Sequence, residues 1–243
     1  MSENKPLLKE NIINQIKKIE NINIFLDKNY INWNNEKYMK MYDWMSRWYD
    51  LVETIIWRIL HWNSVKKLRT DLMSKLEWKD NISILYVSIW TWTDLKYIPE
   101  KIDKTKLEIT WIDISLWMLK KCYNNFSKKL NLSLFQCCAE NLPFKDEQFD
   151  IVFHVWWINF FNDKKLAIKE MLRVAKKWTK ILIADETSDY IDKQYKKSSL
   201  SKKYFENQTF DLKDIDESIP KDIFELKKEF LWKNNFYCIT FRK

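Results

Sequence analysis

The sequence predicts a doubly wound α/β fold around a mostly parallel sheet. Five short apolar runs alternate with stretches of helical spacing, a pattern typical of parallel strands joined by right-handed crossovers. The runs are continuously apolar, as expected for strands that are buried on both faces. They span residues 82–89, 107–113, 132–139, 149–155 and 179–186. The predicted crossover helices cover about residues 94–101, 115–129 and 163–176. Ser115 and Asp163 are the candidate N-caps of the second and third of these helices.

The two ends of the chain depart from this alternation. Residues 1–79 are predicted to form an N-terminal helical cap, because apolar residues recur at helical spacing from Leu8 to Ile19 and from Tyr42 to Ile59. Residues 80–243 form the predicted sheet domain, in which residues 188–220 are a polar, partly helical insertion. Residues 224–243 have the pattern of two strands joined around residues 233–235, which predicts an antiparallel hairpin at one sheet edge.

The composition contains one strong anomaly. The chain has 243 residues and no glycine, but it has 14 tryptophans. Ordinary usage of roughly 7% would supply about 17 glycines. Glycine is the default residue where the backbone needs a positive φ angle. We therefore treat the absence of glycine and the excess of tryptophan as one anomaly, and ask whether tryptophan occupies positions where glycine is expected.

Charge distribution, the length of apolar runs and cysteine spacing count against several classes of protein. The net charge of +8 is spread evenly along the chain, with few arginines and no basic block, so a nucleic-acid partner is not favoured. The apolar runs are shorter than a membrane span, and the first ten residues lack the apolar stretch of a signal peptide. We therefore expect a cytoplasmic protein without a transmembrane segment. The four cysteines lack CxxC spacing, which favours free, buried thiols over a zinc site or disulfides.

Polar or unusual residues follow each of the first four predicted strands, where a doubly wound sheet binds its ligands. If Trp90 and Trp92 are read as glycine, the first segment becomes V-S-I-G-T-G-T-D-L, a turn from a strand into a helix N-terminus. Asp113 follows the second strand, 21 residues after Trp92. A carboxylate in this position can accept hydrogen bonds from both ribose hydroxyls of a nucleotide-like cofactor. The third strand leads into the segment A-E-N-L-P-F at residues 139–144.

With tryptophan read as glycine, the segment from about residue 82 to residue 186 resembles the class I S-adenosylmethionine-dependent methyltransferases. The likeness is to the small-molecule type that includes ubiquinone and menaquinone biosynthesis enzymes. The matching segments are ILYVSIWTWTDL, ITWIDISLWMLKKC, CAENLPFKDEQFDIVF and LRVAKKWTKILIADE. The resemblance implies a Rossmann-like fold, S-adenosyl-L-methionine as cofactor, a small-molecule methyl acceptor and methyl transfer by direct displacement. The chain departs from the family pattern at Tyr86, Ser88 and Cys138, where an acid, a glycine and an aspartate are usual.

The resemblance also implies a set of cofactor-binding residues. The backbone around Ser88, Trp90 and Trp92 would lie against the methionine part, Asp113 would bind the ribose, and the segment from His154 to Trp156 would line the methyl-transfer side. The full implied set is Tyr49, Ser88, Trp90, Trp92, Thr93, Asp94, Asp113, Ile114, Met118, Ala139, Glu140, His154 and Trp156.

Three of these residues have alternative interpretations. His154 is the candidate general base if the substrate nucleophile must lose a proton, but a packing or orienting role at the strand end is the alternative. Asp113 could instead be a plain helix N-cap. Glu140 could instead be a solvated loop acid. No metal site is expected in this set.

Literal tryptophans at the turn conflict with the implied activity. An indole at position 90 or 92 would occupy the space where backbone and cofactor should meet, so we expect the chain as written to bind S-adenosylmethionine poorly. A bulky residue in a left-handed turn also costs on the order of 1–2 kcal/mol. The simplest explanation is an alternative genetic code in which UGA means glycine, read with a table in which UGA means tryptophan.

Two other functions remain open from the sequence. An NAD(P)-dependent oxidoreductase on a similar sheet normally has a third glycine, but the corresponding stretch here is residues 93–95, T-D-L. A non-catalytic, aromatic-rich binding protein would stack its tryptophans on sugars or bases. It would gather those tryptophans on one surface, whereas Trp90, Trp92, Trp111 and Trp178 are expected at the ends of separate elements.

Overall fold

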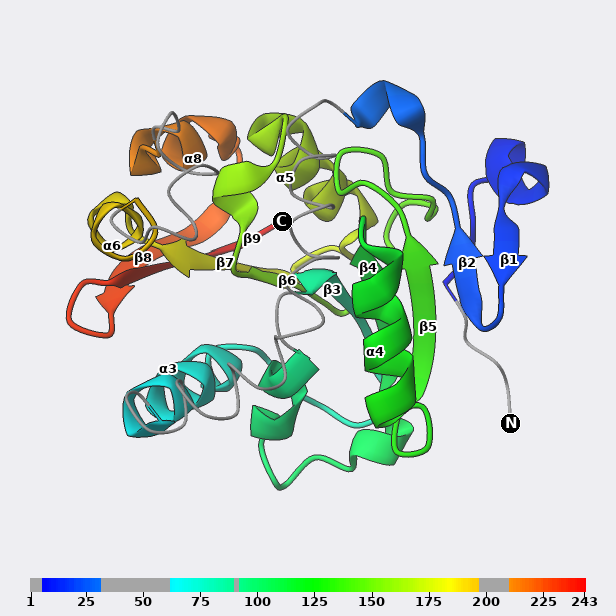
Figure 1. Ribbon diagram of the computed structural model, residues 1–243, viewed down its shortest axis with the longest axis horizontal. Helices are drawn as coiled ribbons and strands as arrows, with labels where there is room; N and C mark the ends of the chain where they lie inside the picture. The colour runs from blue at the N-terminus through cyan, green and yellow to red at the C-terminus, as the bar shows by residue number, and fades with distance from the viewer. Residues whose placement is uncertain (1–5, 32–61, 90–91, 197–209) are drawn as a thin grey trace.

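A computed structural model describes residues 6–31, 62–89, 92–196 and 210–243. These residues form one sheet of nine strands in the order β1-β2-β5-β4-β3-β6-β7-β9-β8 (Figure 1). Its five central strands are mutually parallel, which confirms the predicted fold class. They are β3 (Ser83–Ile89), β4 (Glu108–Asp113), β5 (Asn131–Gln136), β6 (Ile151–Val155) and β7 (Lys180–Glu186).

Helices cover both faces of the sheet and bury two separate apolar clusters. One cluster includes residues of α3 (Trp62–Ser74), η4 (Trp92–Tyr97) and α4 (Leu116–Phe126). The other includes residues of α5 (Lys164–Val174) and α8 (Leu212–Ser218). Figure 1 shows α3 on one side of the sheet and α5 and α8 on the other. Short 3-10 turns, η5 (Lys104–Lys106) and η6 (Ile158–Phe160), complete the connections.

The two predicted N-caps are confirmed. The Ser115 hydroxyl accepts a hydrogen bond from the Met118 N–H, and the Asp163 carboxylate accepts one from the Leu166 N–H. Each satisfies a backbone donor that the first turn of a helix leaves unpaired. The helix expected at 94–101 is instead the tighter and shorter η4.

The helix expected from Leu8 to Ile19 is wrong. This segment forms η1 (Glu10–Gln15) and β1 (Lys17–Ile19), followed by β2 (Ile22–Ile24) and η2 (Lys28–Tyr30). β2 runs parallel to β5 with Ile22 opposite Leu134, and Ile22 is buried there. Pairing with an open sheet edge outweighs the helical spacing, so part of the predicted cap belongs to the sheet. The helix predicted from Tyr42 to Ile59 lies outside the described residues.

The C-terminal hairpin is confirmed. β8 (Phe224–Leu231) and β9 (Phe236–Arg242) are antiparallel, and β9 pairs antiparallel with β7. The segment predicted as a partly helical insertion contains α6 (Ser188–Gln194) and α8, while its residues 197–209 lie outside the described part.

Several tryptophans occupy backbone conformations that favour glycine. The φ angles of Trp156, Trp157, Trp178 and Trp232 are 74°, 79°, 62° and 49°. Such left-handed backbone costs a bulky residue on the order of 1–2 kcal/mol, whereas glycine adopts it freely. Trp111 differs: it lies inside β4 and is fully buried, so the expectation that it ends an element is wrong.

We predict that Trp178→Gly stabilises the protein by about 1 kcal/mol, because glycine relieves the left-handed strain at this position. Trp178 is 61% exposed and contacts the Phe224 ring, so little core packing is lost. The measurement is the free energy of unfolding in urea.

The matched control for this prediction is Trp117→Gly. Trp117 lies within α4, where the lower helix propensity of glycine should destabilise the protein by roughly 0.5 kcal/mol. Equal destabilisation by both substitutions would contradict the assignment of Trp178 as a glycine-type position.

Candidate functional site

The carboxyl ends of β3 and β4 bring the first candidate residues together. Val87 pairs with Ile112, so Ser88 and Asp113 follow at the same edge of neighbouring strands. Ser88 has a φ of 58°, and the pairing of β3 with β6 shifts register between Val87 and Ile89. This left-handed backbone agrees with the glycine that the resemblance expects at position 88. Trp90 and Tyr49 lie outside the described residues.

Asp113 is fixed by the turn that follows β4. One of its carboxylate oxygens accepts the Ser115 N–H at 2.7 Å, and the side chain is 7% exposed. Ser115 is the N-cap of α4, so the alternative interpretation of Asp113 as that N-cap is wrong. Ile114 and the buried Met118 lie in the same turn and the helix that it starts. Gln136 of β5 donates to the Ile114 carbonyl at 2.9 Å and holds the turn in place.

Asp94 is predicted to contact the cofactor, but its described contacts are with protein groups. The Tyr86 hydroxyl donates to one carboxylate oxygen at 2.5 Å, and the Arg69 Nε lies 3.1 Å from the other. Asp94 is fully buried, and Arg69 also donates to the Thr93 hydroxyl. Burial, followed by the Asp94 charge, raises the pKa of Tyr86 well above its usual value. The network therefore ties α3 to β3 and η4.

This network contains one of the residues that depart from the pattern of the resemblance. Tyr86 stands where an acid is usual, and Asp94 supplies a carboxylate that meets its hydroxyl. Sequence reasoning missed Arg69, because a single arginine within a predicted helix carries no signal of a tertiary ion pair.

Glu140 is buried rather than solvated, so the alternative of a solvated loop acid is wrong. The side chain accepts the N–H groups of Asn162 and Asp163, at 3.0 and 3.4 Å. Burial raises the pKa of Glu140, and these hydrogen bonds oppose the rise. Ala139 is also buried, at 6% exposure, so the loop after β5 is held firmly against the start of α5.

His154 lies at the end of β6 and is fully buried. Its Nδ1 lies 2.8 Å from the Val87 carbonyl, so Nδ1 carries the proton and Nε2 carries the lone pair. Within the described residues, Nε2 has no hydrogen-bond partner. Burial lowers the pKa of His154 to about 4, so the imidazole is neutral near pH 7.

The turn after β6 is held by a carboxylate that sequence reasoning missed. Trp156 and Trp157 are both left-handed, and Trp156 packs in the core with its ring centroid 4.5 Å from that of Phe236. Asp185 of β7 accepts the N–H groups of Trp157 and Asn159, at 3.0 and 3.1 Å. Burial raises the pKa of Asp185 to about 6. The signal in the sequence was an acid at the end of the fifth predicted strand.

Other features of the described chain are simpler. The four cysteines are free and buried, as predicted. No group of histidine, cysteine or acidic side chains in residues 6–31, 62–89, 92–196 and 210–243 is arranged to hold a metal ion. None of the helices in these segments combines the length and apolar character needed to cross a membrane.

Comparison with known proteins agrees with this architecture. Residues 96–183 match the family described as a methyltransferase domain. An uncharacterised protein of Methanocaldococcus jannaschii is 30% identical over 124 residues, which cover 51% of this chain and 55% of the relative. A ubiquinone/menaquinone biosynthesis C-methyltransferase of Geotalea daltonii is 24% identical over 62% of this chain and 63% of its own length. The chain thus spans less than two thirds of each of these relatives.

Solved structures show the same fold at low sequence identity. A SAM-dependent methyltransferase of Thermotoga maritima superposes with a TM-score of 0.57 at 18% identity, covering 84% of this chain and 99% of that one. A SAM-dependent methyltransferase of Aquifex aeolicus gives 0.52 at 14% identity, covering 71% and 88%. Residues 96–183 thus match a methyltransferase domain, and the described residues share the fold of S-adenosylmethionine-dependent methyltransferases.

Proposed function

We propose that this protein transfers a methyl group from S-adenosylmethionine to a small-molecule acceptor. The observation that carries the proposal is the juxtaposition of the left-handed Ser88 and the buried Asp113 at the ends of adjacent parallel strands. This is the edge at which doubly wound sheets bind nucleotide-like ligands. The relatives in ubiquinone and menaquinone biosynthesis support the same class of reaction.

The residues present fit such a cofactor at one end of the site. Asp113 is a strand-end carboxylate suited to the ribose hydroxyls, with Ile114 and Met118 beside it. Ala139 and Glu140 lie on the loop assigned to the adenine side. When bound, S-adenosylmethionine supplies a methyl group that its sulfonium charge already activates. The contribution of the protein is therefore to position the acceptor in line and to exclude water.

His154 is proposed as an orienting residue rather than a strong base. Its Nδ1–H is committed to the Val87 carbonyl, and a pKa of about 4 leaves Nε2 a weak proton acceptor. A base is needed only if the acceptor nucleophile must lose a proton, and Nε2 is then the group at this strand end that can accept it.

The tryptophans at positions 90 and 92 do not suit close backbone approach to a cofactor. We propose that glycine is the functional residue at both positions, as it would be if UGA codons were read as glycine. Four other tryptophans with positive φ angles support this interpretation. UGG codons in the coding DNA at these positions would contradict it. We also propose a cytoplasmic location. Like the small-molecule acceptor, this location is inferred from the sequence.

The double substitution Trp90→Gly/Trp92→Gly is expected to strengthen the binding of S-adenosylhomocysteine at least tenfold, because it removes two indoles from the cofactor turn. The measurement is isothermal titration calorimetry on the chain as written and on the variant. Binding of NADH but not of S-adenosylhomocysteine would contradict the proposed function.

In the double variant, Asp113→Asn should weaken this binding roughly 10- to 100-fold, which corresponds to the loss of charge-assisted hydrogen bonds. Asp103→Asn is the matched control. Asp103 caps η5 away from the strand ends, and asparagine preserves a cap. Equal losses in both variants would argue against a ribose contact at Asp113.

The buried His154 also predicts a pH dependence of stability. The folded protein resists protonation down to about pH 4, whereas the unfolded chain takes up the proton near pH 6.5. Stability from this group is therefore complete above pH 6.5 and is lost as the pH falls toward 4. Between pH 7 and pH 5 the loss is about 2 kcal/mol.

His154→Asn should lack this contribution, because the asparagine amide can still donate to the Val87 carbonyl but does not titrate. The measurement is the free energy of unfolding in urea at both pH values for each protein. Identical pH dependence in the two proteins would show that His154 does not remain neutral in the folded state.

A further inference from the structure

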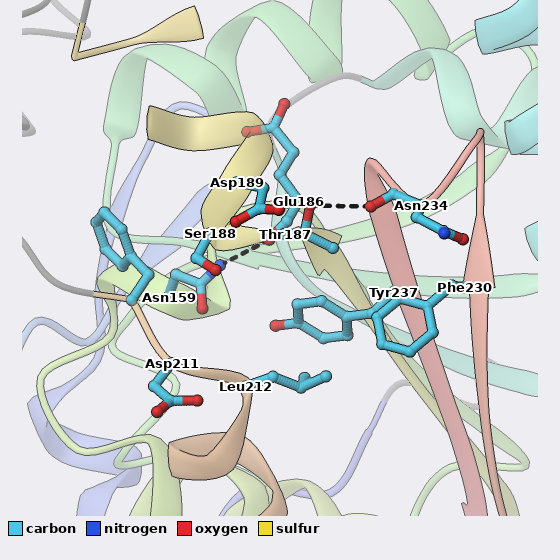
Figure 2. A pocket seen from close by; sticks show the side chains of 11 residues that line it. Asn159, Glu186, Thr187, Ser188, Asp189, Asp211, Leu212, Phe230, Asn234 and Tyr237 are labelled. Carbon is cyan, nitrogen blue, oxygen red and sulfur yellow. Dashed lines mark hydrogen bonds between the residues drawn. The ribbon is translucent and has the colours of Figure 1, made fainter. Parts of the chain in front are cut away.

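A cavity of about 330 Å³ lies beyond the carboxyl end of β7 (Figure 2). The first turns of α6 and α8 and the β8–β9 hairpin enclose it. In the sheet, β6 separates β7 from β3, so the cavity is two strands away from the proposed cofactor turn. Asn159 of η6 reaches the cavity from the segment that follows Trp156. The cavity is therefore placed to hold part of a methyl acceptor.

The charge of this cavity is opposite to that of the protein as a whole. The net charge of the chain is +8, but no lysine, arginine or histidine is among the described residues that line the cavity. Asp189 and Asp211 lie at its exposed rim. Asp211 caps α8 by accepting the Lys213 N–H at 2.9 Å. The lining therefore favours a positively charged ligand.

Tyr237 provides a second, independent indication of a ligand. Its side chain is 2% exposed, and Figure 2 shows its hydroxyl pointing into the space between the surrounding side chains. Among the residues that the structure describes, this hydroxyl has no hydrogen-bond partner. Burying a polar group without a partner is unfavourable, and a hydrogen-bond donor on a ligand would offset that cost.

The surroundings of this hydroxyl are negative. Burial raises the pKa of Tyr237 first, and the charges of Asp185 and Asp216 raise it further. The phenol therefore stays protonated, and its oxygen lies in the field of carboxylates. Phe210 and Phe230 add aromatic rings to the lining, and such rings attract cations through their faces.

We propose that this cavity binds the protonated amine of an organic cation. The ammonium group would donate a hydrogen bond to the Tyr237 hydroxyl and face Asp189 and Asp211. The identification of this amine as part of the methyl acceptor rests on the proposed function. The existence of the cation site does not depend on that function.

The test uses three probes that differ mainly in charge: 2-phenylethylamine, 2-phenylethanol and 3-phenylpropionate. Calorimetry at pH 7, without cofactor, should give at least tenfold tighter binding for the amine than for the alcohol, and the weakest binding for the carboxylate. Tyr237→Phe should weaken amine binding roughly 2- to 12-fold, as expected for one lost hydrogen bond. The double variant Asp189→Asn/Asp211→Asn should lose the preference for the amine.

Asparagine at position 211 can still cap α8, so the double variant should fold normally, and circular dichroism checks this. Asp192→Asn is the matched control: Asp192 lies on α6, pairs with Lys196 and does not line the cavity. It should leave amine binding unchanged.

Equal affinity for the amine and the alcohol, absence of amine binding, or an unchanged amine preference in the double aspartate variant would each overturn the cation site. S-adenosylhomocysteine binding is measured in parallel on the Trp90→Gly/Trp92→Gly protein. Its failure alongside a retained amine preference would count against the proposed function and leave the cation site standing.

Discussion

The structure depends on tight, left-handed turns at the carboxyl edge of its parallel sheet. Ser88 bends the chain near the end of β3, and Trp156 and Trp157 turn it after β6. A chain without glycine makes these turns with residues that carry a Cβ atom, at a cost in backbone strain. The same turns create the edge on which the proposed cofactor and acceptor sites lie.

Buried carboxylates hold these turns in place. Asp94 links the start of η4 to Tyr86 of β3 and to Arg69 of α3. Asp185 accepts the N–H groups of Trp157 and Asn159 in the turn after β6. Because a buried carboxylate is stabilised by such donors and is costly without them, each network favours one arrangement of its turn. The pairing within the sheet sets the order of the strands, and these carboxylate networks fix the turns at the carboxyl ends of the strands.

Much of the fold could be predicted because the relevant signals are local. The five parallel strands are continuous apolar runs, and Ser115 and Asp163 cap helices within four residues of their partners. The N-terminal segment was mispredicted because its strands depend on an open edge of β5, far away in the sequence. No local pattern distinguishes such a strand from an amphipathic helix.

The candidate site was predictable to a similar extent. The position of Asp113 at a strand end could be predicted, because it follows from the apolar run that precedes it in the sequence. The role of Asp94 was missed because its partners come from α3 and β3, and the role of Asp185 because its partners lie on the neighbouring strand. Tyr237 showed no sign of function in the sequence, since an unpaired hydroxyl is visible only when its surroundings are known.

The proposed cofactor site consists of the segment at the end of β3 and the residues from Asp113 to Met118. Hydrogen–deuterium exchange of the Trp90→Gly/Trp92→Gly protein, with and without S-adenosylhomocysteine, tests it most directly. We expect the ligand to slow exchange in residues 86–95 and 113–118 and to leave exchange in β8 unchanged. Protection confined to other segments, or none at saturating ligand, would contradict it.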